Sequence, residues 1–235
     1  MAVPDAELQL ERADLALMRD VRELAERLPA VDVVISNAAV IAELDDITEE
    51  GVQRTLATNH LAPHLLMRLL AGERAARFVV VGADPGALAR VPVDVDDLRS
   101  VRGLGKVPGM RPFALYGRTK NMNAMFVYAL ARRLDGTTVT VNGAHPGIIK
   151  GTGLGRDARG ALKAFGAAMQ ANPLLKGPDA GADTPAWLAT SNNVDGVTGR
   201  FFVDREQVDT APHTTDAERC DRLWDESARL VGLDP

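Results

Sequence analysis

The 235-residue sequence predicts an α/β fold, built as a doubly wound, mainly parallel sheet with helices on both faces. Two observations lead to this fold class. The short apolar runs at Val31–Ile35 and Phe78–Val81 are typical of strands buried on both faces. Each run is followed by a longer segment in which apolar residues recur at helical spacing. With 46% hydrophobic residues and no internal repeat or linker, residues 1–235 are expected to form a single domain.

The periodicity assigns each element in order. Residues 7–11 alternate apolar and polar side chains, which predicts a short strand before the first helix. The following elements are expected to be a helix at 17–28, a strand at 31–35, a helix at 49–70, a strand at 78–81, a helix at 114–134, and strands at 138–142 and 199–203. Residues 151–185, rich in Gly, Ala and Pro, are expected to form a substrate loop or lid.

Composition excludes several classes of partner. The formal net charge is −5 and aromatic residues make up 4% of the chain, so neither a basic block nor a stacking surface predicts nucleic-acid binding. The single Cys220 allows no internal disulfide and suits a reducing compartment. No apolar run is long enough to cross a bilayer, and residues 1–14 lack the apolar core of a signal peptide. The protein is therefore expected to be cytoplasmic, with no membrane partner.

Tyr116 and Lys120 form the most informative pair, because side chains four residues apart share one face of a helix. A fixed ammonium stabilises a phenolate and lowers the phenol pKa from its usual value near ~10. Such a pair can pass a proton to or from a carbonyl or alcohol oxygen. The spacing alone is also typical of an ordinary half-exposed helix face.

Several motifs in order resemble those of the short-chain dehydrogenase/reductase family, in its retinol-dehydrogenase-like branch. They are Ser36-Asn37-Ala38-Ala39 after a strand, Asn59 in the next helix, Tyr116 with Lys120, and His145-Pro146-Gly147 after the following strand. The resemblance runs from Ala6 to Leu233. It implies a Rossmann-type fold and an NAD- or NADP-dependent oxidoreductase that interconverts a carbonyl and an alcohol.

The resemblance also implies roles for the catalytic candidates. Tyr116 would be the general acid/base, Lys120 would lower its pKa and hold the nicotinamide ribose, and Asn59 would order a water in the proton relay. Asn59 also falls on the same helix face as Val52 and Leu56, where a buried amide that braces the helix is an equally good interpretation.

Cofactor-binding candidates follow from the same resemblance. Asn37, Ala38 and Ala39 follow a strand end; Pro146-Gly147 would face the nicotinamide amide, although the pair is also an ordinary strand-ending turn. Asp14-Leu15 would border the adenine, or would only begin a helix. Thr152 would assist, but it comes one residue later than the family's Thr because Gly151 looks inserted. The choice between NAD and NADP stays open.

The first departure from the family pattern is the missing TGxxxGxG turn, which holds the cofactor pyrophosphate. The chain begins where the family's third strand would begin, so the first βαβ region is expected to be absent. The Gly-rich run 151–155 lies near the other end of the sheet and is no substitute. A misplaced gene start, a true truncation and a decayed paralogue are three open explanations.

The second departure is Ala83, which stands with Gly82 where the family places a Ser that hydrogen-bonds the substrate oxygen. Losing one such donor commonly costs about 10²- to 10³-fold in rate. Thr119 points about 100° around the helix from Lys120 and is no obvious replacement. The substrate could bring its own hydroxyl, a neighbouring loop could supply a donor, or the chemistry is weak.

Three functions follow. The first is an oxidoreductase for a small, apolar carbonyl or alcohol substrate, assembled as a homo-oligomer. The second is a catalytically impaired pseudoenzyme, kept as an interaction partner through the 114–134 helix. The third is a cofactor-independent dehydratase, isomerase or cyclase that uses Tyr116 and Lys120. The four histidines are scattered without ligand spacing, so each is interpreted as structural and no metal is expected; they are His60, His64, His145 and His213.

Overall fold

The computed structural model describes residues 7–72, 75–88, 91–156, 158–173 and 175–235, and its centre is a five-stranded sheet. The strands lie side by side in chain order: β1 (Val31–Ser36), β2 (Ala75–Val81), β3 (Thr140–His145), β4 (Arg200–Val203) and β5 (Glu206–Val208). The first four are parallel and β5 is antiparallel to β4. The predicted α/β fold with a mainly parallel sheet is confirmed.

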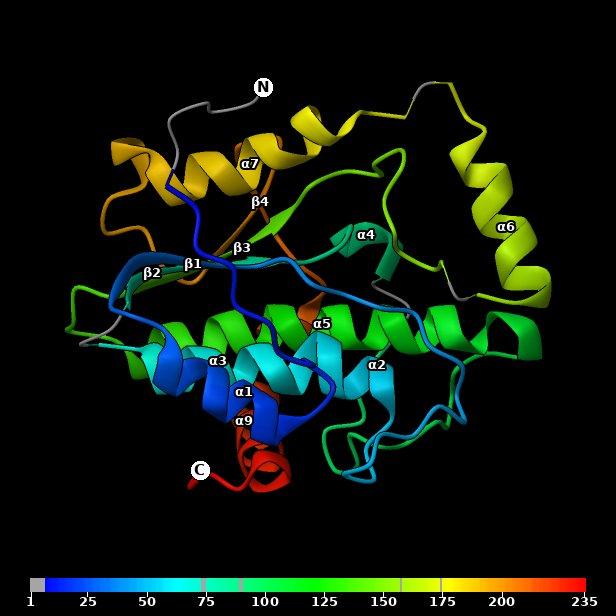
Figure 1. Ribbon diagram of the computed structural model, residues 1–235, viewed down its shortest axis with the longest axis horizontal. Coiled ribbons are helices and arrows are strands. Elements are labelled where there is room, and N and C mark those ends of the chain that lie inside the picture. The colour runs from blue at the N-terminus through cyan, green and yellow to red at the C-terminus, as the bar shows by residue number, and fades with distance from the viewer. Residues whose placement is uncertain (1–6, 73–74, 89–90, 157, 174) are drawn as a thin grey trace.

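Helices cover both faces of this sheet (Figure 1). On one face lies α7 (Pro178–Thr190); on the other lie α1 (Met18–Arg27), α3 (Ala62–Leu70), α5 (Arg111–Arg133) and α9 (Ala217–Val231). Side chains of β2 alternate between the two cores, because Phe78 and Val80 pack in the cluster with α5 whereas Val79 packs in the cluster with α7. Burial on both faces explains why the strands read as continuous apolar runs.

The helix predicted at 49–70 begins only at Arg54. Gly51 has φ +74°, which ends any helix before it, and the Gln53 side chain accepts a hydrogen bond from the Leu56 amide at 3.1 Å. A short α2 (Arg54–Leu56) then continues as a π-helical turn, Ala57–Leu61, before α3. Pro63 lacks the amide hydrogen that would bond the Asn59 carbonyl, so this turn widens at the Asn59 position.

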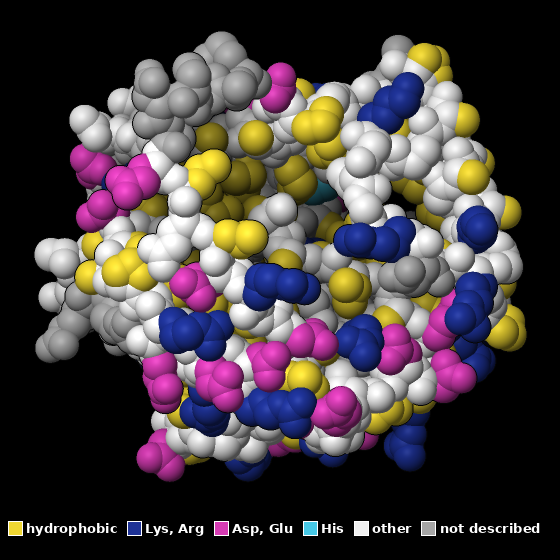
Figure 2. Space-filling view, in the orientation of Figure 1, with side chains coloured by type: hydrophobic (Ala, Val, Ile, Leu, Met, Phe, Trp, Pro, Cys, Tyr) yellow, Lys and Arg dark blue, Asp and Glu magenta, His cyan; other side chains and the backbone are white. Residues whose placement is uncertain are grey.

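The strand predicted at residues 7–11 is wrong. These residues are not a strand, and Leu8 and Leu10 are 89% and 87% exposed. Alternation stabilises a strand only where another strand pairs with it and an apolar surface covers one face, and no described strand lies beside this segment. Strand β1 is consequently an edge, with Ile35 44% exposed. Figure 2 shows this side of the molecule, hydrophobic and hollowed above, with charged side chains over the helices below.

Three other predicted elements shift at their ends, and the first of them, β2, begins at Ala75, three residues before the predicted start. Helix α5 begins at Arg111, three residues before the predicted start, because Pro112 is tolerated in a first turn. Strand β3 covers Thr140–His145 instead of residues 138–142, since Thr137 still belongs to the turn that closes on Leu134. The α1 and β4 segments lie within a residue of their predicted bounds.

The sequence interpretation did not assign several elements. The largest is α9, which begins where Asp216 caps the Arg219 amide at 2.8 Å and which packs along α5. The others are β5, α4 (Pro85–Leu88), α6 (Gly160–Gln170), α8 (Pro212–Thr215) and the 3₁₀ turns Pro108–Met110 and Asn192–Val194. Residues 178–185 of the expected lid belong to α7 and pack on the sheet. None of the described helices has both the length and the apolarity to cross a bilayer.

Candidate active site

Tyr116 and Lys120 lie on α5 beside the carboxyl ends of the parallel strands, where ligands bind in open α/β sheets. The Lys120 ammonium donates a hydrogen bond to the carbonyl oxygen of Val81, the last residue of β2, at 2.8 Å. Its nitrogen is 5.6 Å from the centre of the Tyr116 ring. The predicted pair is therefore brought together, and both side chains are buried.

The electrostatics of the pair differ from the expected lowering of the phenol pKa. Burial raises the pKa of Tyr116 to about 12, and burial lowers the pKa of Lys120 to about 8. Desolvation disfavours the charged form of each group, and this effect exceeds any help that the ammonium gives to a phenolate. At pH 7 the phenol keeps its proton, so Tyr116 in this structure can donate a proton to a bound group.

Asn59 ties the loop after β1 to α5. Its side-chain oxygen accepts from the Val40 amide at 2.8 Å, and its side-chain nitrogen donates to the Val40 carbonyl at 2.9 Å and to the Thr119 hydroxyl at 3.2 Å. The Thr119 hydroxyl in turn donates to the Tyr116 carbonyl at 2.7 Å. Both amide hydrogens of Asn59 are used, which favours the bracing interpretation over the water-ordering one.

The position of the family's Ser carries no hydroxyl. A Cβ added to Gly82 would lie 2.7 Å from the Phe201 ring, so a side chain is excluded there unless that ring moves. Ala83 offers only a methyl group. Asp84 caps the first turn of α4 by accepting from the Gly86 amide at 2.8 Å. The sequence shows that positions 82 and 83 lack a hydroxyl, but it could not show that the Phe201 ring lies against Gly82.

Apolar side chains cover Tyr116, and sequence reasoning did not identify them as neighbours. Ile41, Ala158 and Leu162 form a buried cluster with Tyr116, and the Phe113 ring stacks on it with centres 5.9 Å apart. Phe165 of α6 packs edge-on against Phe113 at 5.7 Å. The three-residue spacing of Phe113 and Tyr116 was a readable signal, whereas nothing in the sequence pairs Leu162 with Tyr116.

Three of the cofactor-binding candidates lie in the loop after β1. Asn37 and Ala38 are exposed, and Ala39 packs against the Tyr116 cluster. After β3, Gly147 has φ +89°, a left-handed conformation that favours glycine, and it follows Pro146 at the same sheet edge. These residues share the carboxyl end of the sheet with Tyr116 and Lys120.

Asp14, Leu15 and Thr152 do not join this group. The Asp14 carboxylate accepts from the Ala16 amide at 2.9 Å and lies 3.8 Å from Arg54, so it forms the turn before α1. Leu15 packs against the main core. Thr152 is exposed and has no hydrogen bond to a residue that the structure describes. For Asp14 and Leu15 the helix-start interpretation fits these contacts.

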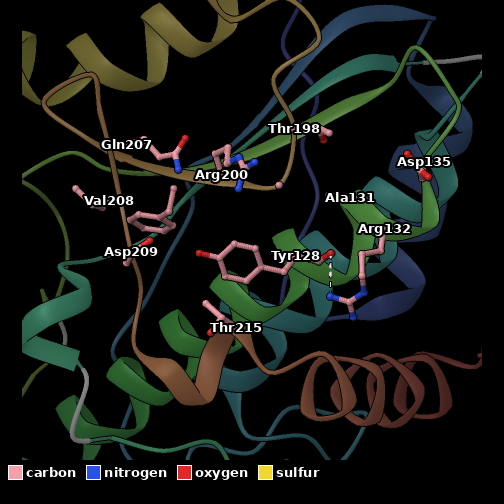
Figure 3. Close-up of a pocket in the computed structure, with 12 residues that line it drawn as sticks. Tyr128, Ala131, Arg132, Asp135, Thr198, Arg200, Gln207, Val208, Asp209 and Thr215 are labelled. Atoms are coloured by element: carbon pink, nitrogen blue, oxygen red, sulfur yellow. Dashed lines mark hydrogen bonds between the residues drawn. The ribbon is translucent and has the colours of Figure 1, made fainter.

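A pocket of about 670 Å³ lies away from Tyr116 and Lys120. It opens between the second half of α5 and the β4–β5 hairpin, where Tyr128, Arg132 and Arg200 project toward it (Figure 3). A second pocket lies at the amino ends of β1 to β3. Tyr116 lines neither pocket, because the apolar cluster described above covers it.

The buried histidines form packing and hydrogen-bond contacts. His60 bonds Asn123 at 3.1 Å and Ser227 at 2.8 Å, and the His64 ring packs on Trp224 with centres 5.1 Å apart. No group of three or more His, Cys, Asp or Glu side chains suited to a metal ion occurs within the described part of the chain.

Comparisons with known proteins place this geometry in a family. Retinol dehydrogenase 14 of Mus musculus is 36% identical over 240 residues, which is 97% of this chain and 69% of that protein. Dehydrogenase/reductase SDR family member 13 of Homo sapiens is 30% identical over 94% of this chain and 59% of that protein. No family model matches the chain.

Solved structures agree on the fold. A protein from Mycobacterium paratuberculosis is 25% identical, with a TM-score of 0.69 over 94% of this chain and 75% of that one. A short chain dehydrogenase from Burkholderia cenocepacia J2315, solved with NADP, is 22% identical, with a TM-score of 0.55 over 82% and 73%. The mainly parallel sheet with helices on both faces is thus a Rossmann-type α/β fold. The chain belongs to the short-chain dehydrogenase/reductase family, with retinol dehydrogenases among its relatives.

Proposed function

We propose that this protein is an NAD- or NADP-dependent oxidoreductase that interconverts a carbonyl and an alcohol. The observation that carries the proposal is the Tyr116–Lys120 pair, buried at the carboxyl end of a parallel sheet in a chain of this family. A bound nicotinamide would supply the hydride. Tyr116, protonated at pH 7, would donate its proton to the carbonyl oxygen during reduction.

The residues at this sheet edge fit the nicotinamide half of such a cofactor. Asn37 and Ala38 are exposed there, Gly147 offers backbone without a side chain, and the Lys120 ammonium lies beside them at the end of β2. The pKa of Lys120, lowered to about 8 by burial, suits a group that exchanges protons near neutral pH. Asn59 would hold the Asn37–Val40 loop in place through Val40.

The substrate is proposed to be apolar, because the surroundings of Tyr116 are apolar. Ile41, Phe113 and Leu162 enclose the ring and leave it 8% exposed. Since Leu162 belongs to α6, the loop and helix at 151–170 would act as the lid of a single domain and open to admit the substrate. Helix α5 is packed against α9 and the π-helical turn Ala57–Leu61, so a homo-oligomer would form through another surface or would displace α9.

One experiment tests the proposal. The purified protein is titrated with NADH and NADPH by fluorescence and then assayed with a panel of aldehydes and ketones of increasing apolar size. Binding near micromolar Kd and reduction that Tyr116→Phe removes are expected, with a loss of about 10²- to 10⁴-fold. A folded protein that binds neither nucleotide would contradict the proposal.

The cofactor-independent alternative keeps some support from the buried Lys120, whose lowered pKa makes it a usable base. The same titration separates the two functions. Chemistry on a carbonyl substrate without added nucleotide, lost in Lys120→Met, would favour the dehydratase, isomerase or cyclase. If the protein neither binds a nucleotide nor shows activity, the remaining candidate function is that of an interaction protein.

A further inference from the structure

His145 ends strand β3 beside the position where the family's Ser is missing. The Gly82 amide donates to the Ala144 carbonyl at 2.7 Å, so the residues after β2 lie against the end of β3. Ala144 packs in the core with α7, whereas Val141 packs in the core with α5. Because side chains alternate along a strand, His145 faces the α5 side, which carries Tyr116 and Lys120.

The His145 ring has no hydrogen-bond partner among the residues that the structure describes. Its Nδ1 atom is buried and unpaired. The nitrogens of His64 are also unpaired, but that ring is enclosed by Phe126 and Trp224 in the helix layer. His145 differs because it stands at the strand ends, where substrate binds, and a buried polar group without a partner is costly.

The pKa of the His145 ring is lowered, mainly by burial, so the ring is neutral near pH 7. Burial lowers its pKa most; Asp84 and Asp204 raise it, and Lys176 and Lys120 lower it further, with a net lowering. A neutral imidazole carries one N–H donor, as a serine hydroxyl does. Such a neutral hydrogen-bond donor is missing at Ala83, where the family has a Ser.

We propose that His145 is a catalytic residue that donates a hydrogen bond to the substrate oxygen, in the place of the hydroxyl that Ala83 cannot supply. This inference rests on the proposed function and assigns a role to a residue that the sequence interpretation treated as structural. With this role, the Tyr116–Lys120 pair can act although Ala83 supplies no hydrogen-bond donor, because the His145 ring at the end of β3 supplies it.

The test compares four proteins in carbonyl reduction with NADPH: the wild type, His145→Ala, Ala83→Ser and the double variant. We expect His145→Ala to lower kcat by about 10²-fold, with NADPH affinity and the circular dichroism spectrum unchanged. Ala83→Ser should restore kcat to within about tenfold of wild type in the double variant. His213→Ala, a histidine in α8, should keep wild-type kcat.

The pH profile separates a hydrogen-bond donor from a packing residue. In the wild type, kcat should change at acid pH as the His145 ring takes up a proton and becomes a cationic donor, and this change should vanish in the double variant. An unchanged kcat in His145→Ala would overturn the inference while leaving the oxidoreductase intact. Loss without rescue by Ala83→Ser, in a variant that still binds NADPH, would also overturn it. A wild type that binds no nucleotide would end both proposals.

Discussion

The Lys120 ammonium lies at the carboxyl end of strand β2, 5.6 Å from the centre of the Tyr116 ring. It donates to the Val81 carbonyl at 2.8 Å, and the phenol gains no lowering of its pKa. The lysine is thus held in place before any ligand arrives. Its position depends on the strand, so the pair is pre-assembled by the fold, and the protonation of each group is set by burial.

This burial makes the stability of the protein depend on pH through Lys120. The folded pKa is about 8, against 10.5 for the ordinary side chain, so between these values the unfolded chain binds more protons. Stability should therefore rise as pH increases from about 8 to 9, where ionisation of the Cys220 thiol in the unfolded chain begins to oppose it, because burial raises the pKa of that thiol to about 11 in the folded protein. The full effect is about 3 kcal/mol at most.

Urea denaturation at several pH values checks this prediction. Lys120→Met should remove the rise, because Met fills a similar volume without a charge to desolvate. The exposed Lys163→Met is the matched control and should keep the wild-type slope. A slope that survives in Lys120→Met would assign the effect to another group.

His60 should make stability depend on pH in the same direction, but in the acid range. Burial lowers its pKa to about 4, from 6.5, although the bond to Asn123 opposes the shift. Between pH 6.5 and 4 the unfolded chain takes up a proton that the folded protein refuses, so stability should fall as pH falls, by up to about 3 kcal/mol. Thermal unfolding of His60→Gln should show a smaller fall than the wild type, and the remainder is expected from the buried His64, whose pKa is also lowered. Replacing the half-buried His213 in the same way should change the fall less.

The regular elements could be predicted because their causes are local. The apolar run at Val31–Ile35 and the stripe of α1 both reflect burial that the sequence itself records. The strand at residues 7–11 failed because alternation is only half of the cause, and the other half is a neighbouring strand. The late start of the helix at Arg54 was readable in part, since Gly51 is a common helix breaker, whereas the widened turn at Asn59 depends on Pro63.

The candidate site divides in the same way. Tyr116, Lys120 and Asn59 could be proposed as site residues because helix spacing and family resemblance fix their positions along the chain. Their partners were not found, because Val81, Val40 and Leu162 meet them only through the tertiary fold. The pKa of Tyr116 was predicted in the wrong direction since the sequence gives the neighbouring charge but not the depth of burial.

Asn59 should be required for the order of the loop after β1. Asn59→Ala would leave the Val40 amide and carbonyl without their partners, at a cost of about 1–3 kcal/mol for each unpaired buried group. Hydrogen exchange should show the Val40 amide losing protection. The Ala42 amide, bonded to the Thr55 hydroxyl at 3.0 Å, should keep its own. Asn37→Ala, at an exposed position of the same loop, is the control and should leave both amides unchanged.

Gly143 should tolerate no side chain while Phe201 is present. A Cβ at this position of β3 would collide with the Phe201 ring, which also lies against Gly82. Gly143→Ala should destabilise the protein by about 1–3 kcal/mol, because the ring has to leave a packed position. Adding Phe201→Leu should cost less in that background than in the wild type, since both changes act on one contact.

Chemical denaturation of the two single variants and the double variant measures this coupling. Gly166→Ala in α6 is the matched control, because open space surrounds that position, and it should stabilise the protein by about 0.5–1 kcal/mol through helix propensity. If the costs of Gly143→Ala and Phe201→Leu simply add, the ring is not what excludes a side chain at Gly143. The same result would weaken the argument that Phe201 keeps a hydroxyl from position 82.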